Sequence, residues 1–383
     1  MAHITIDYTP AVHQSAGIGR LTRESVRALL QCDSPHRFTL FCMGRPAASA
    51  LSRSAVANGR AAWVVTPLND RWLYRLWHRA RLPVPVEVFS GRSDLYHATD
   101  FVLPPTTPRK RTVLTVHDLT FERAPDAAPP QLLRFLKRVV PQSVRRAHHL
   151  IADSQSTARD LIELYGAPAE RITVIYSGID ARFCPTHSAS PTSAAVRDKY
   201  ALGEEPFVLT VGTLQPRKNH LTLVRAFAQV AERLPDLKLV IAGGKGWMYD
   251  AVTAEVARLN LNRRVQFIGF VEDADLPDVY RAARVFTFPS LYEGFGLPPL
   301  EAMACGIPVV ASNTSSLPEV VGDAGLLVDP FDVDGLAGAL LRAATDDVWR
   351  AQAIERGLNR ARAFTWGRAA EQLLAVYDAV LAS

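Results

Sequence analysis

The sequence predicts an α/β protein built from two successive parallel sheets, each flanked by helices. Short runs of β-branched and aromatic residues alternate with segments of helical periodicity, a pattern typical of strand–helix–strand units. A stretch rich in Pro, Ser, Thr and Ala at residues 183–203 interrupts the alternation, which then starts again. The length of 383 residues suits two domains. We therefore expect one domain at residues 1–190, a second at 205–363 and a final amphipathic helix at 364–383.

The composition indicates a soluble globular protein. Hydrophobic residues make up 48% of the chain and charged residues 21%, and no window approaches about eighteen uninterrupted apolar residues. The N-terminal segment lacks the basic and apolar regions of a secretory signal, so we expect a cytoplasmic location. The four cysteines show no C-x-x-C pair and no disulfide-like spacing, which predicts reduced thiols and no structural metal site.

The charge is uneven along the chain. The net charge is +5, and the excess of Lys and Arg lies before residue 191. A basic first half can face an anionic substrate, an anionic membrane or nucleic acid. Because no segment resembles a nucleic-acid-reading module, we expect no nucleic-acid partner.

The first half opens with a strand at residues 3–8, a loop containing Gly17 and Gly19, and a helix at residues 21–31. This order is how a Rossmann-like half begins. A G-x-G pair also occurs in many loops that only turn the chain. The dinucleotide fingerprint needs a third glycine where this chain has Thr22, which argues against an NAD-dependent oxidoreductase.

The strand that ends at His117 is the one most closely tied to function in this half. In open α/β sheets, ligands bind at the carboxyl ends of the strands. His117 stands at such a strand end and is therefore a site candidate. An isolated His-Asp pair is usually structural, and Asp118 is expected to fix its loop. The other expected strands of this half lie at residues 38–43, 62–65, 94–97, 150–153 and 172–176.

Two stretches of the first half combine basic residues with aromatic or aliphatic ones, at residues 71–82 and 132–149. A helix at 71–82 would place Trp72 and Trp77 on one side with arginines around them. Such a helix either packs its aromatic residues into the domain or lies among the headgroups of a membrane. The sequence leaves both interpretations open.

The second half repeats the strand–helix pattern and adds two adjacent cations. A strand at residues 207–211 ends in GTLQPRKN, and a helix at 221–233 follows. Arg217 and Lys218 therefore stand just beyond the carboxyl end of a strand, near Gly212. Arg can hold a phosphate through two hydrogen bonds and Lys acts as a point charge, so this turn is a candidate phosphate site.

The stretch FPSLYEGFGLPPLEAMACGIPVVAS at residues 288–312 is a strand end, a glycine loop, a helix and the next strand. The glycines let backbone amides approach a ligand, and the helix that starts beside them favours an anion at its positive end. Glu293 and Glu301, with seven residues between them, flank this space. Carboxylates suit hydroxyl groups, as on a sugar and a ribose. The remaining expected elements are strands at 237–242 and 265–268 and helices at 273–284 and 332–344.

The motif E-x7-E within EGFGLPPLEAMACGIPVV resembles the signature of retaining family 4 glycosyltransferases, the glycosyltransferase group 1 domain. The resemblance implies the GT-B fold, in which two Rossmann-like domains have parallel sheets that face each other across a cleft. It also implies that the last helix crosses back to the first domain. The GTLQPRKN and HDLTF variants look most like bacterial mannosyltransferases of surface polysaccharide or lipopolysaccharide synthesis. The implied reaction transfers mannose from GDP-mannose to a hydroxyl of a glycan or lipid-linked acceptor.

The resemblance further implies roles for individual residues. The catalytic group would comprise four residues: His117 at the transferred sugar, Arg217 and Lys218 at the diphosphate, and Glu293. Glu293 would accept hydrogen bonds from the sugar hydroxyls, and Glu301 from the ribose hydroxyls. The other expected contacts to the donor, mainly through backbone and apolar groups, are at Gly17, Gly19, Gly212, Gly269, Phe270, Val271, Gly294, Phe295, Gly296 and Leu297.

The expected mechanism uses no metal and no cofactor other than the nucleotide-sugar co-substrate. Many members of the family carry Arg after the glycine where this chain has Thr213, so the phosphate role rests on Arg217 and Lys218. The two D-x-D matches, at residues 273–275 and 332–334, precede helices and are expected to be N-caps. Transfer with retention would proceed on the front face of the sugar, with the leaving phosphate helping to take the acceptor's proton.

Other interpretations stay open at this point. A UDP-sugar could be the donor instead of GDP-mannose, and a non-catalytic sugar-nucleotide-binding subunit would share the fold. A subunit of that kind would be expected to lose Glu293, Arg217 or Lys218, and all three are present. A phosphorylase would need a lysine-bound pyridoxal phosphate and a far longer chain. The acceptor is expected to contact residues 69–92 and 120–131, and the basic stretches suggest a contact with the inner face of the cell membrane.

Overall fold

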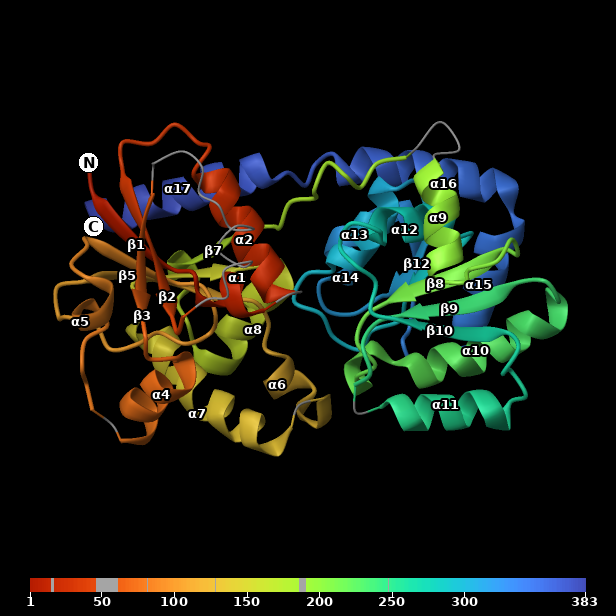
Figure 1. Ribbon diagram of the computed structural model, residues 1–383, viewed down its shortest axis with the longest axis horizontal. Helices are drawn as coiled ribbons and strands as arrows, with labels where there is room; N and C mark the ends of the chain where they lie inside the picture. The colour runs from red at the N-terminus through yellow and green to blue at the C-terminus, as the bar shows by residue number, and fades with distance from the viewer. Residues whose placement is uncertain (15–16, 46–60, 81, 128, 186–190, 247) are drawn as a thin grey trace. The chain divides into compact units, whose positions relative to one another are not determined.

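The computed structural model (Figure 1) describes the chain apart from residues 15–16, 46–60, 81, 128, 186–190 and 247 and the side chains of residues 127 and 191–193. Part of the expected linker and one residue of the basic stretch at 71–82 thus lie outside the described residues. The chain divides into two compact units. The first comprises Met1–Glu122, Pro129–Gly178 and Thr365–Ser383, and the second comprises Arg123–Ala128 and Ile179–Phe364.

The sheet of the first unit has, among the described residues, seven strands in the order β3-β2-β1-β4-β5-β6-β7, all parallel. The order reverses between β1 and β4, which is where ligands bind in such sheets. Buried runs rich in Val, Ile, Leu and Phe explain why the five central segments form interior strands, whereas the edge strands β3 and β7 are partly exposed. The strands are β1 (His3–Asp7), β2 (Arg37–Met43), β3 (Ala61–Thr66), β4 (Leu95–Ala98), β5 (Arg111–Val116), β6 (His149–Ala152) and β7 (Ile172–Val174).

Helices cover this sheet, and local signals explain their ends. Ser154 caps α8 through a hydrogen bond to the N–H of Thr157, and Gly166 ends the helix in the left-handed conformation. The elements are α1 (Thr9–His13), α2 (Ile18–Leu29), α4 (Asp70–Tyr74), the π-helical turn η1 (Arg75–Arg79), α5 (Glu87–Ser90), α6 (Thr120–Arg123), α7 (Pro130–Arg146), α8 (Gln155–Tyr165), η3 (Ala169–Arg171) and α17 (Trp366–Ala382).

Helix α17, the last of the chain, belongs to the first unit and packs beside α2 (Figure 1). Its apolar face joins the core formed by β1, β2 and α2. The hydroxyl of Tyr377 lies 2.7 Å from Nδ1 of the buried His97, on β4, and Asp378 lies 2.7 Å from Nε2 of His36. Two polar contacts thus add to the apolar packing that holds α17.

The sheet of the second unit has, in the described part of the chain, six parallel strands in the order β10-β9-β8-β11-β12-β13. Here the order reverses between β8 and β11. The strands are β8 (Phe207–Val211), β9 (Lys238–Ala242), β10 (Val265–Gly269), β11 (Val285–Phe288), β12 (Val309–Ser312) and β13 (Gly325–Val328). Both units therefore confirm the predicted α/β class with parallel sheets.

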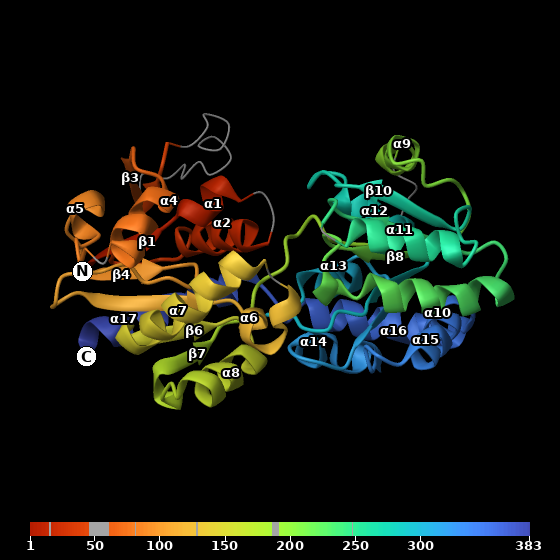
Figure 2. The same cartoon turned by 90° about the horizontal axis from the view of Figure 1, so that it is seen from below.

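The helices of this unit complete the alternation. Helix α10 lies between α11 and α15 (Figure 2), and its apolar side chains fill the core against β8 and β9. The elements are α9 (Pro191–Lys199), η4 (Pro216–Lys218), α10 (His220–Arg233), α11 (Tyr249–Arg258), α12 (Leu276–Ala282), α13 (Leu297–Ala304), α14 (Leu317–Val321), η5 (Gly322–Ala324), α15 (Val333–Thr345) and α16 (Asp347–Ala361), with η2 (Pro125–Ala127) from the inserted segment.

Three details differ from the expectations. The stretch expected to be a linker contains α9, which packs on α12, because Val196 is buried there. Asp332 caps α15 as predicted, but Asp275 gives α12 no side-chain cap and instead pairs with Lys199. The helix expected at 71–82 runs from Asp70 to Arg79 and changes from α-helical (α4) to π-helical (η1) geometry at Arg75.

None of the helices in the part of the chain that the structure describes has the length and apolar character needed to cross a membrane.

Candidate functional site

The candidate site lies where the strand order of the second sheet reverses. The GTLQPRKN turn follows β8 and the EGFG loop follows β11, and these two strands are neighbours. Parallel strands present their carboxyl ends on one edge, so the two loops meet there. The N–H of Leu291 donates to the carbonyl of Arg217 at 2.7 Å, which joins the loops directly.

Three predicted residues come together at this edge. Oε2 of Glu293 accepts a hydrogen bond from Nη1 of Arg217 at 2.5 Å, and its Oε1 accepts from Nζ of Lys218 at 2.7 Å. The Glu293 side chain is only 9% exposed. Burial by itself would raise the pKa of Glu293, but the charges of Arg217 and Lys218 outweigh it and lower that pKa to about 2. Glu293 is therefore ionised, and the three side chains together keep an excess of positive charge.

Packing fixes the position of Lys218. Its ammonium lies 4.3 Å from the centre of the Phe288 ring, a cation–π contact at the end of β11. Gly212 lies beneath the stem of the lysine. A Cβ at Gly243, whose φ is +151°, would lie 2.0 Å from the carbonyl oxygen of Gly212, so only glycine fits where the loop after β9 passes. The position of the cation thus depends on close backbone packing at this edge.

Hydroxyl groups hold the EGFG loop. Ser315 accepts from the N–H of Glu293 at 2.9 Å, and Ser316 donates to the carbonyls of Glu293 and Phe295. Gly296, with a φ of +119°, is the N-cap of α13 and offers no side-chain cap. Because residues 298 and 299 are prolines, Leu297 supplies the one backbone N–H among the first three residues of α13. The start of α13 therefore offers an anion fewer backbone N–H groups than a helix without these prolines would.

Glu301 lies deeper than Glu293. It is 2% exposed and accepts a hydrogen bond from the hydroxyl of Tyr280, on α12, at 2.8 Å. The sequence did not indicate this partner, because Tyr280 is 21 residues away along the chain. The Tyr280 hydroxyl must share Glu301 with any hydroxyl that a ligand brings.

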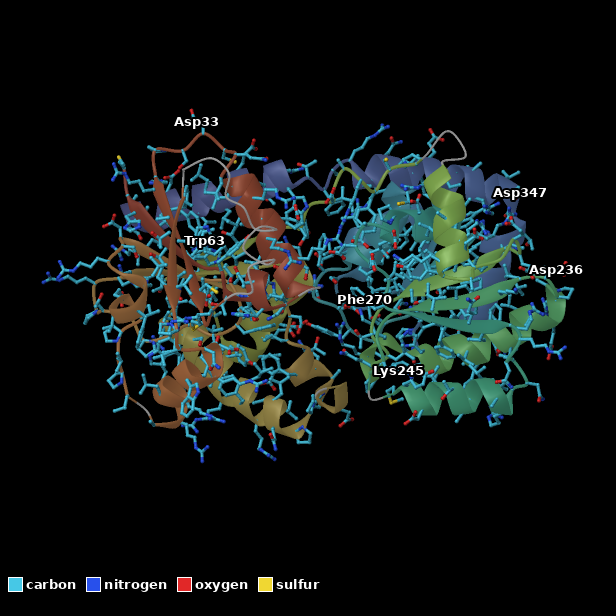
Figure 3. The ribbon with its side chains drawn as sticks, viewed as in Figure 1. Asp33, Trp63, Asp236, Lys245, Phe270 and Asp347 are labelled. Atoms are coloured by element: carbon cyan, nitrogen blue, oxygen red, sulfur yellow. The ribbon has the colours of Figure 1, made fainter. Side chains whose placement is uncertain are left out.

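The segment Gly269-Phe270-Val271 begins at the last residue of β10. Phe270 is 58% exposed and labelled in Figure 3, whereas Val271 is buried. The carbonyl of Gly269 accepts from the N–H of Gly243 at 2.7 Å, so the loops after β9 and β10 support each other. Of the three, the Phe270 ring has the free face on which a planar ligand can stack.

In the first unit, His117 follows β5 and is buried. Its Nδ1 lies 2.8 Å from Oδ2 of Asp153, and its Nε2 lies 2.8 Å from the carbonyl oxygen of Thr99. Burial alone would lower the pKa of His117, but the Asp153 carboxylate raises it to about 9. Asp118 accepts from the N–H of Thr120 and fixes the loop, as the sequence suggested.

Gly17 and Gly19 lie at the start of α2, directly after residues 15–16, which are outside the described residues. Gly17 is the N-cap of α2, with a φ of +58°. A Cβ at Gly19 would lie 2.1 Å from the carbonyl oxygen of Gln14, so this glycine is needed where α2 packs closely on that residue. The Arg23 side chain donates to the carbonyls of Ala11 and Gln14 and so ties α2 to the end of α1.

Family models cover both halves of the chain. Residues 15–183 match glycosyltransferase family 4, and residues 193–360 match the glycosyl transferases group 1 model. The chain is 36% identical over 305 residues to O-antigen chain mannosyltransferase B of Escherichia coli, covering 79% of this chain and 78% of that protein. It is 30% identical over 304 residues to the serotype-specific mannosyltransferase WbdA of Escherichia coli, covering 78% of this chain and 37% of that protein.

Solved structures show the same fold. Anabaena Alr3699/HepE in complex with UDP and glucose matches with a TM-score of 0.76 and 22% identity, covering 99% of this chain and 100% of that chain. WaaG, a glycosyltransferase involved in lipopolysaccharide biosynthesis, matches with a TM-score of 0.70 and 17% identity, covering 98% of this chain and 99% of that chain. At these identities the likeness establishes the architecture alone.

Proposed function

The chain belongs to the group 1, family 4 glycosyltransferases of the GT-B fold, and from this membership we propose that it transfers mannose from GDP-mannose, with retention and without a metal. The proposed acceptor is a hydroxyl of a glycan or lipid-linked glycan in surface polysaccharide or lipopolysaccharide synthesis. Mannose is favoured by the similarity to the O-antigen mannosyltransferase, which extends over most of both chains.

The observation that carries the proposal is the Arg217–Lys218–Glu293 cluster. Two fixed cations lie at the carboxyl edge of the sheet, held by one buried carboxylate. A nucleoside diphosphate brings the negative charge that such cations bind, and its charge grows as it departs. On binding, the diphosphate oxygens would take over the two cations, and Glu293 would turn to the hydroxyls of the sugar.

The proposed chemistry keeps the configuration of the sugar carbon. The bond from C1 to the diphosphate oxygen breaks while the acceptor oxygen bonds to C1 on the same face. The acceptor's proton passes to the departing diphosphate, so no protein base is needed. Glu293 is a poor nucleophile in this scheme, because it is paired to two cations and its pKa is lowered to about 2, mainly by Arg217 and Lys218 against the opposing effect of burial.

Two further residues would complete the donor site. Phe270, exposed after β10, offers a face for the base. Glu301 would accept from the ribose hydroxyls while keeping Tyr280 as its partner, since a carboxylate has lone pairs for several donors. The glycines near β8 and β11, Gly212, Gly294 and Gly296, would let the backbone approach the diphosphate.

A metal is not needed in this proposal. The two cations supply the charge that a divalent ion would otherwise supply. One aspartate of each D-x-D match is engaged elsewhere, Asp275 with Lys199 and Asp332 with the start of α15. We therefore propose that transfer continues in the presence of a chelator.

The first unit supports a proposed contact with the inner face of the cell membrane. Trp72 on α4 is 60% exposed and Leu132 on α7 is 47% exposed. The elements lie against each other, because the Tyr74 and Phe135 rings are 6.0 Å apart. Arg75 lies 5.1 Å from the Trp72 ring. Exposed aromatic and aliphatic groups beside arginines suit an anionic headgroup layer, and we propose a cytoplasmic protein that binds this surface peripherally.

The first test is a thermal-shift series with GDP, UDP, ADP and their common sugars, with EDTA and then with Mg²⁺. A ligand at about a hundred times its dissociation constant stabilises by about 2.7 kcal/mol. A shift with GDP and GDP-mannose supports the proposed donor. A shift with UDP alone indicates a UDP-sugar donor instead of GDP-mannose. UDP is the nucleotide in the HepE complex, which has a similar fold. No shift with any nucleotide contradicts the proposed function.

A second measurement tests retention and metal independence. Transfer from GDP-mannose to a glycan acceptor is followed by NMR, which reports the anomeric configuration of the first product. An α-linked product from the α-linked donor, formed in EDTA, is expected. A β-linked product contradicts retention, and loss of activity in EDTA that Mg²⁺ restores contradicts metal independence.

A further inference from the structure

The His117 ring joins three neighbouring strand ends of the first sheet. His117 follows β5, its Nδ1 contacts Asp153 after β6, and its Nε2 contacts the Thr99 carbonyl after β4, each at 2.8 Å. Strands β4, β5 and β6 are adjacent in the sheet. The His117 side chain is 6% exposed and the Asp153 side chain 7%. Both ring nitrogens are therefore engaged inside the protein.

The two partners determine how many protons the ring carries. A carbonyl oxygen only accepts, so Nε2 must carry a hydrogen to bond with Thr99. An ionised carboxylate also only accepts, so Nδ1 must carry one to bond with Asp153. A bare Nδ1 would place its lone pair 2.8 Å from a carboxylate oxygen. Both contacts are satisfied either by an imidazolium paired with an ionised Asp153 or by a neutral ring that accepts from a protonated Asp153, and burial raises the pKa of the Asp153 carboxyl.

The surrounding charges favour the imidazolium state. Asp153 faces the ring from the loop after β6 and Asp100 from the loop after β4, and both interact favourably with its positive charge. His97, on β4, stays neutral because burial, helped by the charge of His117, lowers its pKa to about 3. Asp118, on the same loop as His117, bonds to backbone. The ring is thus surrounded mainly by negative or neutral groups.

A strained turn lies beside the ring. Phe101 has a φ of +51°, unusual for a bulky residue, and the N–H of Val102 donates to the carbonyl of Asp100 at 2.5 Å. The Phe101 ring is 5.5 Å from the His117 ring, with the planes at 81°. Thr99, whose carbonyl oxygen accepts from Nε2, comes directly before this turn. The His117 ring therefore anchors the turn at the point where the strand order of the first sheet reverses.

We propose that Asp153 is a positioning residue that keeps His117 as an imidazolium throughout transfer. The proposal rests on the proposed function and deepens it. An imidazolium has no free lone pair and cannot take a proton from the acceptor hydroxyl. His117 is then a cationic anchor of the strand ends of β4, β5 and β6 and not a general base, which agrees with the proposed transfer of the acceptor's proton to the departing diphosphate.

The protonation state is tested directly by NMR of the full chain labelled with 15N-histidine, titrated from pH 5 to 10. The shifts of His117, assigned through His117→Gln, are expected to show both nitrogens protonated at pH 7. His97 serves as the internal reference for a neutral buried ring in the same spectrum. A neutral His117 at pH 7 overturns the proposal. This measurement needs no donor or acceptor, so its outcome is separate from that of the proposed function.

The role in catalysis is tested by the pH dependence of kcat/KM in Asp153→Asn. An asparagine amide can donate to a bare Nδ1, so the buried ring loses its extra proton at a lower pH. Activity of the wild type is expected to fall only as the pH approaches 9. In Asp153→Asn that fall is expected to move down by about two pH units or more, with activity recovered in acidic buffer.

Asp118→Asn is the matched control, since it removes a carboxylate from the same loop without removing a bond to the His117 ring. In this control, the fall of kcat/KM at high pH is expected to occur within about half a pH unit of that in the wild type. The positioning role is overturned if Asp153→Asn lowers kcat/KM equally at every pH. It is also overturned if the fall of kcat/KM at high pH stays where it is in the wild type. A wild-type rate that rises through pH 6–7 as His117 loses a proton overturns it as well.

Discussion

Oε1 of Glu293 lies 2.7 Å from Nζ of Lys218, and the other carboxylate oxygen lies 2.5 Å from Arg217. One carboxylate thus holds both cations of the site. In the proposed donor complex, a diphosphate would displace Glu293 from the two cations, and the carboxylate would then accept hydrogen bonds from sugar hydroxyls. Donor binding and sugar recognition would be coupled through the same side chain.

Glu293→Gln is expected to separate these two functions. The neutral amide no longer competes for Arg217 and Lys218, so GDP should bind about three- to tenfold more tightly. Loss of the carboxylate from the sugar should lower kcat by about a hundredfold. Calorimetric titration with GDP and a transfer assay check the two effects. Glu255→Gln, which breaks similar ion pairs to Arg225 and Arg258, is the control and should change neither.

Acid should destabilise the second unit partly through Glu293. The pKa of Glu293 is about 2 in the folded protein, because Arg217 and Lys218 outweigh the opposing effect of burial, and 4.5 is its ordinary value. Its ionised form therefore stabilises the fold fully above about pH 5, and this contribution is lost as the pH falls toward 2. The contribution is on the order of 3 kcal/mol. Urea unfolding measures the free energy of unfolding at pH 7 and at pH 3. The decrease between these two pH values should be smaller for Glu293→Gln than for the wild type.

Tyr377→Phe tests the attachment of the last helix. The change removes the hydroxyl that lies 2.7 Å from Nδ1 of His97 and leaves a buried ring nitrogen without that partner. The free energy of unfolding of the first unit should fall by about 1–3 kcal/mol. Urea denaturation measures it. Tyr249→Phe, which removes a hydroxyl from a half-exposed ring, should change it by less than about 0.5 kcal/mol.

Trp72→Ala tests the membrane surface. Trp72 is 60% exposed beside Arg75, so its loss should weaken binding to vesicles containing anionic phosphatidylglycerol by about threefold or more. Phe331→Ala removes an exposed ring, 74% accessible, from the second unit and should have no effect. Co-sedimentation with vesicles measures both. Equal binding of the wild type and Trp72→Ala would contradict the proposed contact.

The parts of the site that follow from local sequence were predictable. Arg217 and Lys218 lie in the turn that follows the buried strand β8, and Glu293 lies in the loop after its neighbour β11, so parallel topology brings them to one edge. The glycines beside them mark the points where backbone must pass closely. The parallel sheets themselves follow from the alternating strand and helix patterns.

The partners of these residues were not predictable in the same way. Asp153 is 36 residues from His117, and Tyr280 is 21 residues from Glu301. Such contacts depend on side-chain direction at the ends of different strands and helices, which no local pattern specifies. The same reason explains Asp275, whose place before a helix suggested a cap while Lys199, on another helix, provides its ion partner.

The inclusion of α17 in the first unit affects how the protein folds during synthesis. Residues 365–383 contribute Leu373, Tyr377 and Val380 to a core whose strands begin at residue 3. A nascent chain therefore cannot close that core until residues 365–383 have left the ribosome. The second unit, complete by residue 364, can fold earlier, which reverses the usual N-terminal-first order. A prematurely terminated chain would expose the apolar face of its first sheet and become a substrate for chaperones and proteases.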